Sequence, residues 1–174
     1  MIHVGQKAPD FTNIKAYHKG EFHDISLSDY HGKWLILFFY PRDFTFICPT
    51  EIKGFGAMEE TFKGMNAEVL AASTDSEWSH KNWFERDLPD VKYPVLADNT
   101  HAIAKAYDVY NDEEGLAERG LFIIDPEGVV KYALISSGSV GRSAKETHRV
   151  LEALQSGDLC PMDWEQGGAT LGKA

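Results

Sequence analysis

The segment WLILFFYPRDFTFICPTEI, residues 34–52, joins a long apolar run to two prolines and a cysteine. Residues 34–40 do not alternate between apolar and polar side chains, which predicts a strand buried on both faces of a sheet. Pro41 ends this strand, and Pro49 opens an apolar pattern with the spacing of a helix. The segment therefore predicts a buried strand, a corner and a helix, with Cys48 where the corner meets the helix.

Outward from this segment, predicted strands and helices alternate along the chain. Strands are expected over residues 68–73, 93–97, 121–124 and 129–135, a hairpin over 11–17 and 21–25, and helices over 52–62, 78–83, 101–107 and 143–155. Residues 74–77 carry a capping-box pattern, and Asp98 or Thr100 is expected to cap the helix that follows. This order predicts one α/β domain over residues 1–174, with a mixed central β-sheet flanked by helices and an N-terminal hairpin.

The length and composition exclude several classes of function. A chain of 174 residues predicts a single domain, and 43% hydrophobic with 25% charged residues is ordinary for a globular protein. The net charge of −10 and the absence of a Lys/Arg cluster argue against a nucleic-acid or anionic membrane partner. The N-terminus has no apolar signal-peptide core, and the longest apolar run has seven residues. We therefore expect a cytoplasmic protein.

The cysteines and histidines give no sign of a metal site. Only two cysteines occur, and the seven histidines never fall beside them at the spacing of metal ligands. We expect neither a metal nor a bound cofactor. In a reducing compartment structural disulfides are rare, and paired cysteines are more often redox-active.

Cys48 has two interpretations, as an inert core thiol or as a nucleophile. At the N-cap of the helix that Pro49 opens, a thiolate would face free backbone N–H groups and the positive end of the helix. Thr45 can offer a hydroxyl to a thiolate or to a bound oxygen. A cationic group is still needed to hold the thiolate ionised, and either Arg119 or Arg142 could supply it.

These arginines need a partner to hold them beside the thiol. Glu51, in the first turn of the predicted helix, could orient one of them through a bidentate bond. The sequence spacing permits this arrangement but does not establish it.

The same residues carry a resemblance to a known family. FFYPRDFTFICPTEI resembles the peroxiredoxin signature, in which Pro41, Thr45 and Cys48 meet the Pro-x-x-x-Thr-x-x-Cys pattern. Five further segments resemble the family in the same order: SDYHGKWLILFFYP, STDSEWSHKNW, ERGLFIIDPEGVV, VGRSAKET and GDLCPMDWEQGGATL. The resemblance covers nearly the whole chain and is closest to the typical two-cysteine group, in its bacterial alkyl hydroperoxide reductase (AhpC) branch.

This resemblance implies a thioredoxin-like fold and thiol-dependent reduction of H2O2 and organic hydroperoxides. Cys48 resembles the peroxidatic cysteine, whose thiolate takes an oxygen from the peroxide and becomes a sulfenic acid. Thr45 would hydrogen-bond the thiolate and the peroxide, and Pro41 would shield the pocket. Arg119 matches the active-site arginine. Glu51 and Arg142 resemble the residues that hold that arginine in place.

The second cysteine, Cys160, resembles the resolving cysteine and lies in a C-terminal tail, residues 156–174. In the typical group it attacks the sulfenic acid of a partner subunit, although the sequence leaves an intrasubunit disulfide open. A thioredoxin, a flavoprotein reductase or another CxxC protein would then reduce the disulfide. The family also assembles as homodimers and often as decamers.

Two other functions stay open at this point. The chain could act mainly as a binding or chaperone ring, or as a thiol–disulfide oxidoreductase on the same fold. The second chemistry usually requires Cys-x-x-Cys at the start of the helix, where this chain has Glu51 three residues after Cys48.

Overall fold

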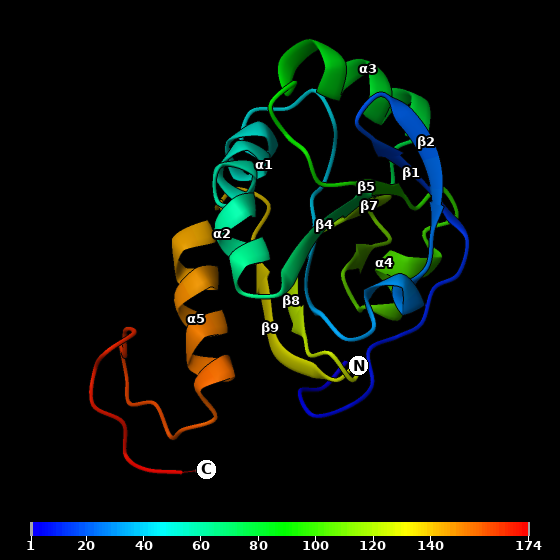
Figure 1. Cartoon of the computed structure of the whole chain (residues 1–174). Coiled ribbons are helices and arrows are strands. Elements are labelled where there is room, and N and C mark those ends of the chain that lie inside the picture. Colours follow the sequence, from blue (N-terminus) through cyan, green and yellow to red (C-terminus); the bar gives the residue numbers. More distant parts are fainter. Residues whose placement is uncertain (1, 174) are drawn as a thin grey trace. The chain divides into compact units, whose positions relative to one another are not determined.

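The computed structural model of the chain describes residues 2–173, which divide into two compact units, one running to Arg142 and one beginning at Ser143. In the first unit, seven strands form a mixed sheet in the order β2-β1-β5-β4-β3-β8-β9 (Figure 1). The strands are β1 (Ile14–His18), β2 (Glu21–Ile25), β3 (Trp34–Phe39), β4 (Ala67–Ser73), β5 (Val95–Ala97), β8 (Arg119–Ile124) and β9 (Val130–Ser136). The helices are α1 (Cys48–Ala57), α2 (Glu59–Gly64), α3 (Glu77–Asp87) and α4 (Ala102–Ala106), with a 3-10 turn over Leu27–Tyr30 and a small ladder of β6 (Tyr110–Asn111) and β7 (Leu116–Ala117).

The strand predicted first lies inside the sheet. β3 pairs in parallel with β4 and antiparallel with β8. Its side chains from residue 35 onward are buried, as the non-alternating pattern predicts. Successive side chains point to opposite faces, so Phe38 stacks on Phe55 of α1 with ring centroids 4.6 Å apart. Phe39 packs instead against Tyr107, which follows α4.

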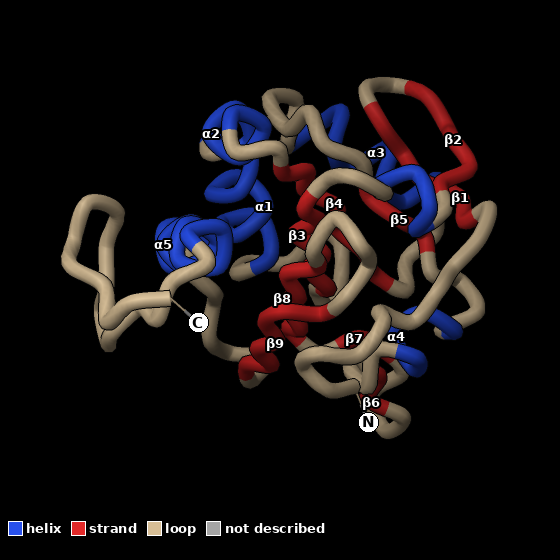
Figure 2. The backbone as a smooth tube through the Cα atoms, turned by 60° about the horizontal axis from the view of Figure 1, so that its bottom comes forward, coloured by secondary structure: helices blue, strands red, loops and turns tan. Residues whose placement is uncertain are grey.

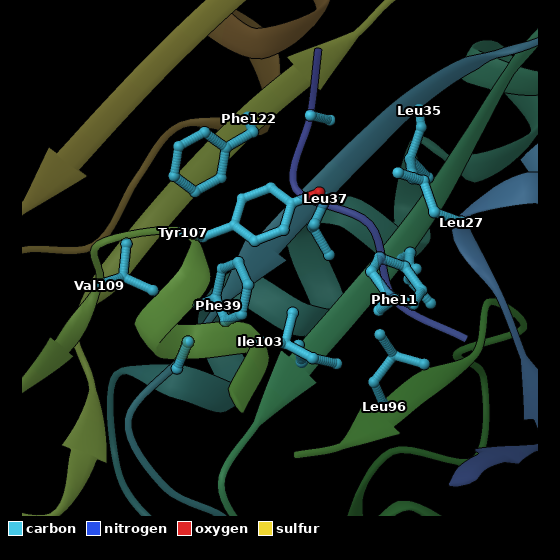
Figure 3. Packing of buried hydrophobic residues seen from close by; sticks show 14 of the residues in the cluster. Phe11, Leu27, Leu35, Leu37, Phe39, Leu96, Ile103, Tyr107, Val109 and Phe122 are labelled. Carbon is cyan, nitrogen blue, oxygen red and sulfur yellow. The ribbon is translucent and has the colours of Figure 1, made fainter. Parts of the chain in front are cut away.

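A large apolar cluster fills the face of the sheet that α4 covers (Figure 3). It joins β3, β8 and α4 to the N-terminal segment, and its ten labelled members are Phe11, Leu27, Leu35, Leu37, Phe39, Leu96, Ile103, Tyr107, Val109 and Phe122. α1 and α2 lie on the other side of the strands (Figure 2). This layered α/β arrangement confirms the predicted fold class, a mixed sheet flanked by helices.

The hairpin is confirmed, and its turn explains the pairing register. Lys19 and Gly20 both have positive φ, 50° and 90°, as a two-residue hairpin turn requires. His18 therefore pairs with Glu21 at the end of the ladder. The hairpin lies beside α3 (Figure 1), where Tyr17 meets Phe84 edge to face.

Some predicted helix boundaries were wrong. The single helix expected over residues 52–62 is two helices, broken at Met58. α3 is capped by Ser76, whose Oγ accepts from Ser79 N, rather than by Thr74 as the capping-box pattern indicated. The N-cap of α4 is His101 rather than Asp98 or Thr100, although the Asp98 carboxylate accepts from the N–H groups of Ile103 and Ala104 in the first turn.

The second unit consists of α5 (Ala144–Ser156) and the segment that follows it. Ser143 caps α5 by accepting from Glu146 N, and Gly157 ends it with a left-handed φ of 65°. Beyond the helix the chain folds back on itself through a pair of backbone hydrogen bonds, from Leu159 to Gly172 and from Leu171 to Leu159.

Across residues 2–173, no helix has the length and apolar character needed to span a membrane.

Candidate active site

Cys48 begins α1, just beyond the end of β3. The N-cap residue is Ile47, so the thiol belongs to the first helical residue and not to the N-cap position that the sequence predicted. Pro49 follows within the first turn, where its missing N–H leaves no hydrogen bond unmade. The side chain of Cys48 is fully buried, yet its sulfur is not in an apolar environment.

Arg119, the first residue of β8, supplies a cation to this thiol. Its Nη1 lies 3.4 Å from Cys48 Sγ and donates to it. Its Nε donates to the carbonyl of Gly138 at 2.9 Å, which holds the plane of the guanidinium. The antiparallel pairing of β3 with β8 brings the two residues together, because it places the start of β8 beside the end of β3.

Glu51 binds both arginines that the sequence offered as candidates. Its carboxylate accepts from Arg119 Nη1 at 2.7 Å, and from Arg142 Nε and Nη2 at 2.7 and 2.9 Å. The backbone N–H of Arg142 adds a fourth donor at 2.7 Å. The three charged side chains are almost completely buried.

This bonding determines the charge of Glu51. Burial by itself would raise the pKa of the carboxyl, but the hydrogen bonds and charge of Arg142, with the charge of Arg119, outweigh burial and lower the pKa. The network therefore keeps Glu51 ionised, and an ionised Glu51 holds Arg119 against the sulfur.

A cavity of about 710 Å³ opens above the thiol. Pro41, Thr45, Cys48 and Arg119 all border it. Cys48 borders the cavity although its side chain is almost completely inaccessible to solvent. The Thr45 hydroxyl donates to the carbonyl of Arg42 at 2.9 Å, so its lone pairs can accept and its proton is engaged by the backbone.

A buried polar network anchors the loop between Pro41 and Cys48. Asp43 accepts from the Tyr40 hydroxyl at 2.7 Å and from Ser79 Oγ at 2.8 Å, and it lies 2.8 Å from His80 Nδ1. Burial, and then the charge of Asp43, raises the pKa of Tyr40 well above its ordinary value, so the phenol remains a donor. The loop is thereby tied to α3.

Four features of the site were missed by sequence reasoning. Arg42 and Glu118 line the cavity, the Gly138 carbonyl holds Arg119, and Asp43 anchors the loop. Asp43 and Arg42 lie in the quoted motif, but their residue types alone show no role. A backbone carbonyl such as that of Gly138 leaves no trace in the sequence.

Cys160 lies in the second unit, after α5. Its Sγ is 3.4 Å from Ser156 Oγ and 3.8 Å from the Ala153 carbonyl, both near the end of that helix. Both cysteines are free thiols, and Cys160 is partly exposed. Within the described chain, no group of three or more His, Cys, Asp or Glu side chains is placed to hold a metal ion.

Comparison with known proteins agrees with this geometry. Residues 4–133 match the AhpC/TSA family. Peroxiredoxin prdx-2 of Caenorhabditis elegans is 47% identical over 177 residues, covering 97% of this chain and 88% of the relative.

Solved structures are similar over almost the whole chain. A reduced 2-Cys peroxiredoxin of Plasmodium vivax superimposes with a TM-score of 0.92 at 33% identity, over 98% of this chain and 93% of that one. AhpC of Enterococcus faecalis superimposes with a TM-score of 0.87 at 39% identity, over 92% and 100%. The buried Cys48 thiol lies at the start of α1 and is held against Arg119. By these similarities the chain belongs to the AhpC/TSA family and is a typical 2-Cys peroxiredoxin of thioredoxin-like fold, a thiol-specific peroxidase whose peroxidatic cysteine is Cys48.

Proposed function

We propose that the peroxidase cycle runs through Cys48 and Cys160 in turn. The Cys48 thiolate attacks the terminal oxygen of a hydroperoxide, the O–O bond breaks, and the leaving alkoxide or hydroxide takes a proton. Sulfur is oxidised by two electrons to a sulfenic acid. The observation that carries this step is the Arg119 Nη1 contact with Sγ, 3.4 Å long, made while the same nitrogen binds Glu51.

Arg119 and Thr45 are the groups proposed to contact the peroxide. Arg119 stabilises both the thiolate and the charge that develops on the leaving oxygen, and it does so as a preorganised donor. Thr45 accepts from the hydroperoxide proton through the lone pairs of its hydroxyl. Pro41 closes one side of the cavity and limits the access of further peroxide to the sulfenic acid.

Glu51 and Arg142 act through Arg119. Arg142 binds Glu51 with two side-chain nitrogens, and Glu51 in turn binds Arg119. These contacts fix the orientation of the Arg119 guanidinium before a substrate arrives. The guanidinium therefore does not need to reorient during the reaction.

Cys160 is proposed to resolve the sulfenic acid. Its thiolate attacks Cys48 Sγ, the S–OH oxygen leaves as water, and a disulfide forms with a second subunit. A dithiol reductant then exchanges with this disulfide and returns both thiols. The reductant is a thioredoxin, a flavoprotein reductase or another CxxC protein, and the working assembly is a cytoplasmic homodimer or decamer. The resemblance to the typical two-cysteine group supports this assignment.

Two cysteine variants test the cycle. We expect Cys48→Ser to abolish peroxide turnover. Cys160→Ser should consume one equivalent of peroxide per subunit and then stop, because nothing resolves the sulfenic acid. Full dithiol-linked turnover in Cys160→Ser would remove the role proposed for that residue.

Non-reducing electrophoresis after one equivalent of peroxide distinguishes the two disulfides. A band at twice the subunit mass that disappears in Cys160→Ser supports the intersubunit bond. A band at the single-subunit mass in the oxidised protein would instead indicate an intrasubunit disulfide. Analytical ultracentrifugation at several protein concentrations measures the oligomeric state.

A further inference from the structure

The disulfide of the proposed cycle requires the start of α1 to open. The Cys160 thiolate forms an S–S bond with Cys48 while the S–O bond of the sulfenic acid breaks, and the oxygen takes a proton and leaves as water. A disulfide brings the Cα atoms of its two cysteines to within about 4.4–6.8 Å of each other. Cys48 is 0% exposed and lies in the first turn of α1. A second backbone can come this close only when that turn unwinds.

The segment that carries Cys48 has few buried contacts of its own. Among residues 44–50, Cys48 is the one buried residue, and Phe46 is 93% exposed. Asp43, just before this segment, is tied to α3 by its buried hydrogen bonds. Segments with few buried contacts open at a low cost in free energy. Residues 44–50 are therefore the part of the site that rearranges most easily.

On the helix side of this segment, Tyr93 anchors the backbone. Its hydroxyl donates to the carbonyl of Ile52 at 2.7 Å, and the side chain is almost completely buried. Burial, and then the charge of Glu59, raises the pKa of Tyr93 well above its ordinary value, so the phenol keeps its proton and remains a donor. Glu51, one residue before Ile52, is bound to the two arginines through its side-chain carboxylate, which leaves its backbone freer to turn. Ile52 is instead fixed through its backbone, by a side chain from outside the helix.

The part of α1 beyond this anchor is held by packing. Phe55 is fully buried and stacks on Phe38 of β3, with ring centroids 4.6 Å apart. Gly56 lies against the segment that precedes β5, because a Cβ added there would be 3.4 Å from Val91 Cγ2 and 4.0 Å from Tyr93 Cε1. These contacts favour a helix that stays intact while the turn before it opens.

We propose that Tyr93 is a positioning residue for the step in which Cys160 attacks Cys48. Its bond to Ile52 fixes the point at which the unwinding of α1 stops, and the fixed helix end is the template on which the first turn forms again. Adding a turn to an existing helix avoids the cost of nucleation, so the closed form with Cys48 beside Arg119 is favoured. Tyr93 thereby limits the fraction of the sulfenic acid that is open to Cys160. This inference rests on the Cys48–Cys160 disulfide of the proposed cycle.

Tyr93→Phe removes only the hydroxyl and tests this role. Reduced protein is mixed with one equivalent of hydrogen peroxide, quenched at intervals with a thiol-blocking reagent, and the rate of disulfide formation is measured by mass spectrometry. A buried hydrogen bond between neutral groups changes an equilibrium constant about two- to ten-fold. We expect disulfide formation to become about two- to ten-fold faster. The reaction of Cys48 with peroxide should keep its rate constant, because the reduced protein stays in the closed form.

Over-oxidation gives a second measurement of the same equilibrium. In the closed form the sulfenic acid meets further peroxide and becomes a sulfinic acid, whereas in the open form it meets Cys160. The peroxide concentration at which half of Cys48 becomes sulfinic acid should therefore rise in Tyr93→Phe by the same factor as the disulfide rate.

Tyr107→Phe is the matched control. The buried Tyr107 hydroxyl also donates to a backbone carbonyl, that of Pro9, at 2.9 Å. Tyr107 belongs to the apolar cluster on the face of the sheet that α4 covers, so its bond does not touch α1. Its loss should lower the stability of the fold but leave the disulfide rate and the over-oxidation threshold at their wild-type values.

Gly54→Ala locates the point at which unwinding stops. Gly54 lies beyond Ile52, an added methyl group there would meet open space, and alanine is the better helix former. Gly54→Ala alone should leave the disulfide rate unchanged, because this residue stays helical throughout. Combined with Tyr93→Phe, it should reverse part of the increase. In the disulfide-linked protein, the amide of Gly56, whose helical acceptor is the Ile52 carbonyl, should be protected from hydrogen exchange in wild type and about two- to ten-fold less protected in Tyr93→Phe.

The outcomes separate the role of Tyr93 from the cycle itself. A disulfide rate in Tyr93→Phe no higher than in wild type, or an equal increase in Tyr107→Phe, would overturn that role and leave the cycle intact. Slower disulfide formation in Gly54→Ala would overturn it as well, because α1 would then unwind past Ile52. Absence of any Cys48–Cys160 disulfide in oxidised wild-type protein would contradict the proposed cycle.

Discussion

At the scale of single residues, Glu51 holds the site together. It is the only carboxylate that contacts Arg119 and Arg142 in the described chain, and its oxygens accept four N–H groups. A carboxylate in this position offsets two buried positive charges. Its removal would therefore affect stability as well as chemistry.

Glu51→Gln should lower the free energy of unfolding by about 3–5 kcal/mol, the cost of leaving buried charge uncompensated. Urea unfolding followed by circular dichroism measures this. Glu68→Gln is the matched control, because the partly exposed Glu68 pairs with Lys33 and an exposed pair contributes about 1 kcal/mol or less. A loss no larger than that of the control would show that the two arginines do not need Glu51.

The pH dependence of this difference has a defined sign. The pKa of Glu51 is lower in the folded state than its ordinary value of 4.5. The stabilisation is thus fully present above pH 4.5 and is lost as the pH falls through the lower, folded-state pKa. The stability gap between wild type and Glu51→Gln should narrow on acidification. A gap that widened would contradict the ionised carboxylate.

The residues that sequence reasoning found are those whose chemistry needs a particular side chain. Cys48, Glu51, Arg119 and Arg142 were proposed together, and the structure brings all four into one cluster. Their roles came from resemblance, since spacing alone could not join residues 71 positions apart along the chain. Arg42 escaped notice because an exposed arginine is usually only a solubilising charge.

At the scale of the elements, β8 positions the arginine that contacts Cys48. Its first residue is Arg119 and its second is Gly120, whose carbonyl accepts from Arg142 Nη1. A Cβ added at Gly120 would lie 2.5 Å from a methyl group of the buried Val109 and 3.2 Å from the Phe122 ring. Position 120 therefore requires glycine because there is no space for a side chain, and not because the backbone adopts a positive φ.

Gly120→Ala should destabilise the protein by about 1–3 kcal/mol through overpacking. It should also slow the oxidation of Cys48, because the strand that carries Arg119 must shift. Adding Val109→Ala should recover part of the loss, which a double-mutant cycle would report as a coupling of about 0.5–3 kcal/mol.

Gly54→Ala serves as the control for this cycle. Gly54 lies in α1, where an added methyl group would meet open space, and alanine is the better helix former, so the change should be neutral or stabilising. Independent, additive effects of Gly120→Ala and Val109→Ala would show that the contact between these two side chains is not the cause.

Element types were easier to predict than element ends. The buried strands and the hairpin follow from apolar runs and turn residues, and the structure confirms them. The break at Met58 and the two-residue strands β6 and β7 were not foreseen. Such features depend on tertiary contacts and hydrogen bonds, which local patterns do not encode.

At the scale of the whole molecule, the described chain has two compact units, and the core cluster belongs to the first. All the members of that cluster precede residue 131. In the segment after α5, Trp164 is the one buried side chain among the described residues. We therefore expect the tail to contribute little to the stability of the fold.

Deleting residues 158–174 should lower the melting temperature by no more than about 4 °C, the shift that about 1 kcal/mol produces in a chain of this size. The truncated protein should still react with one equivalent of peroxide at Cys48 and form no disulfide. Trp164→Ala in the full chain is the companion variant. Loss of cooperative unfolding on truncation would instead make the tail an integral part of the domain.

The antiparallel pairing of β3 with β8 also has a consequence for the newly made protein. Cys48 leaves the ribosome 71 residues before Arg119, and the two meet only after β8 has docked against β3. An unfinished or unfolded chain thus carries an ordinary thiol that reacts slowly with peroxide. Fast reaction with peroxide appears only when the native sheet has formed, so the chains that are oxidised rapidly at Cys48 are the chains that have finished folding.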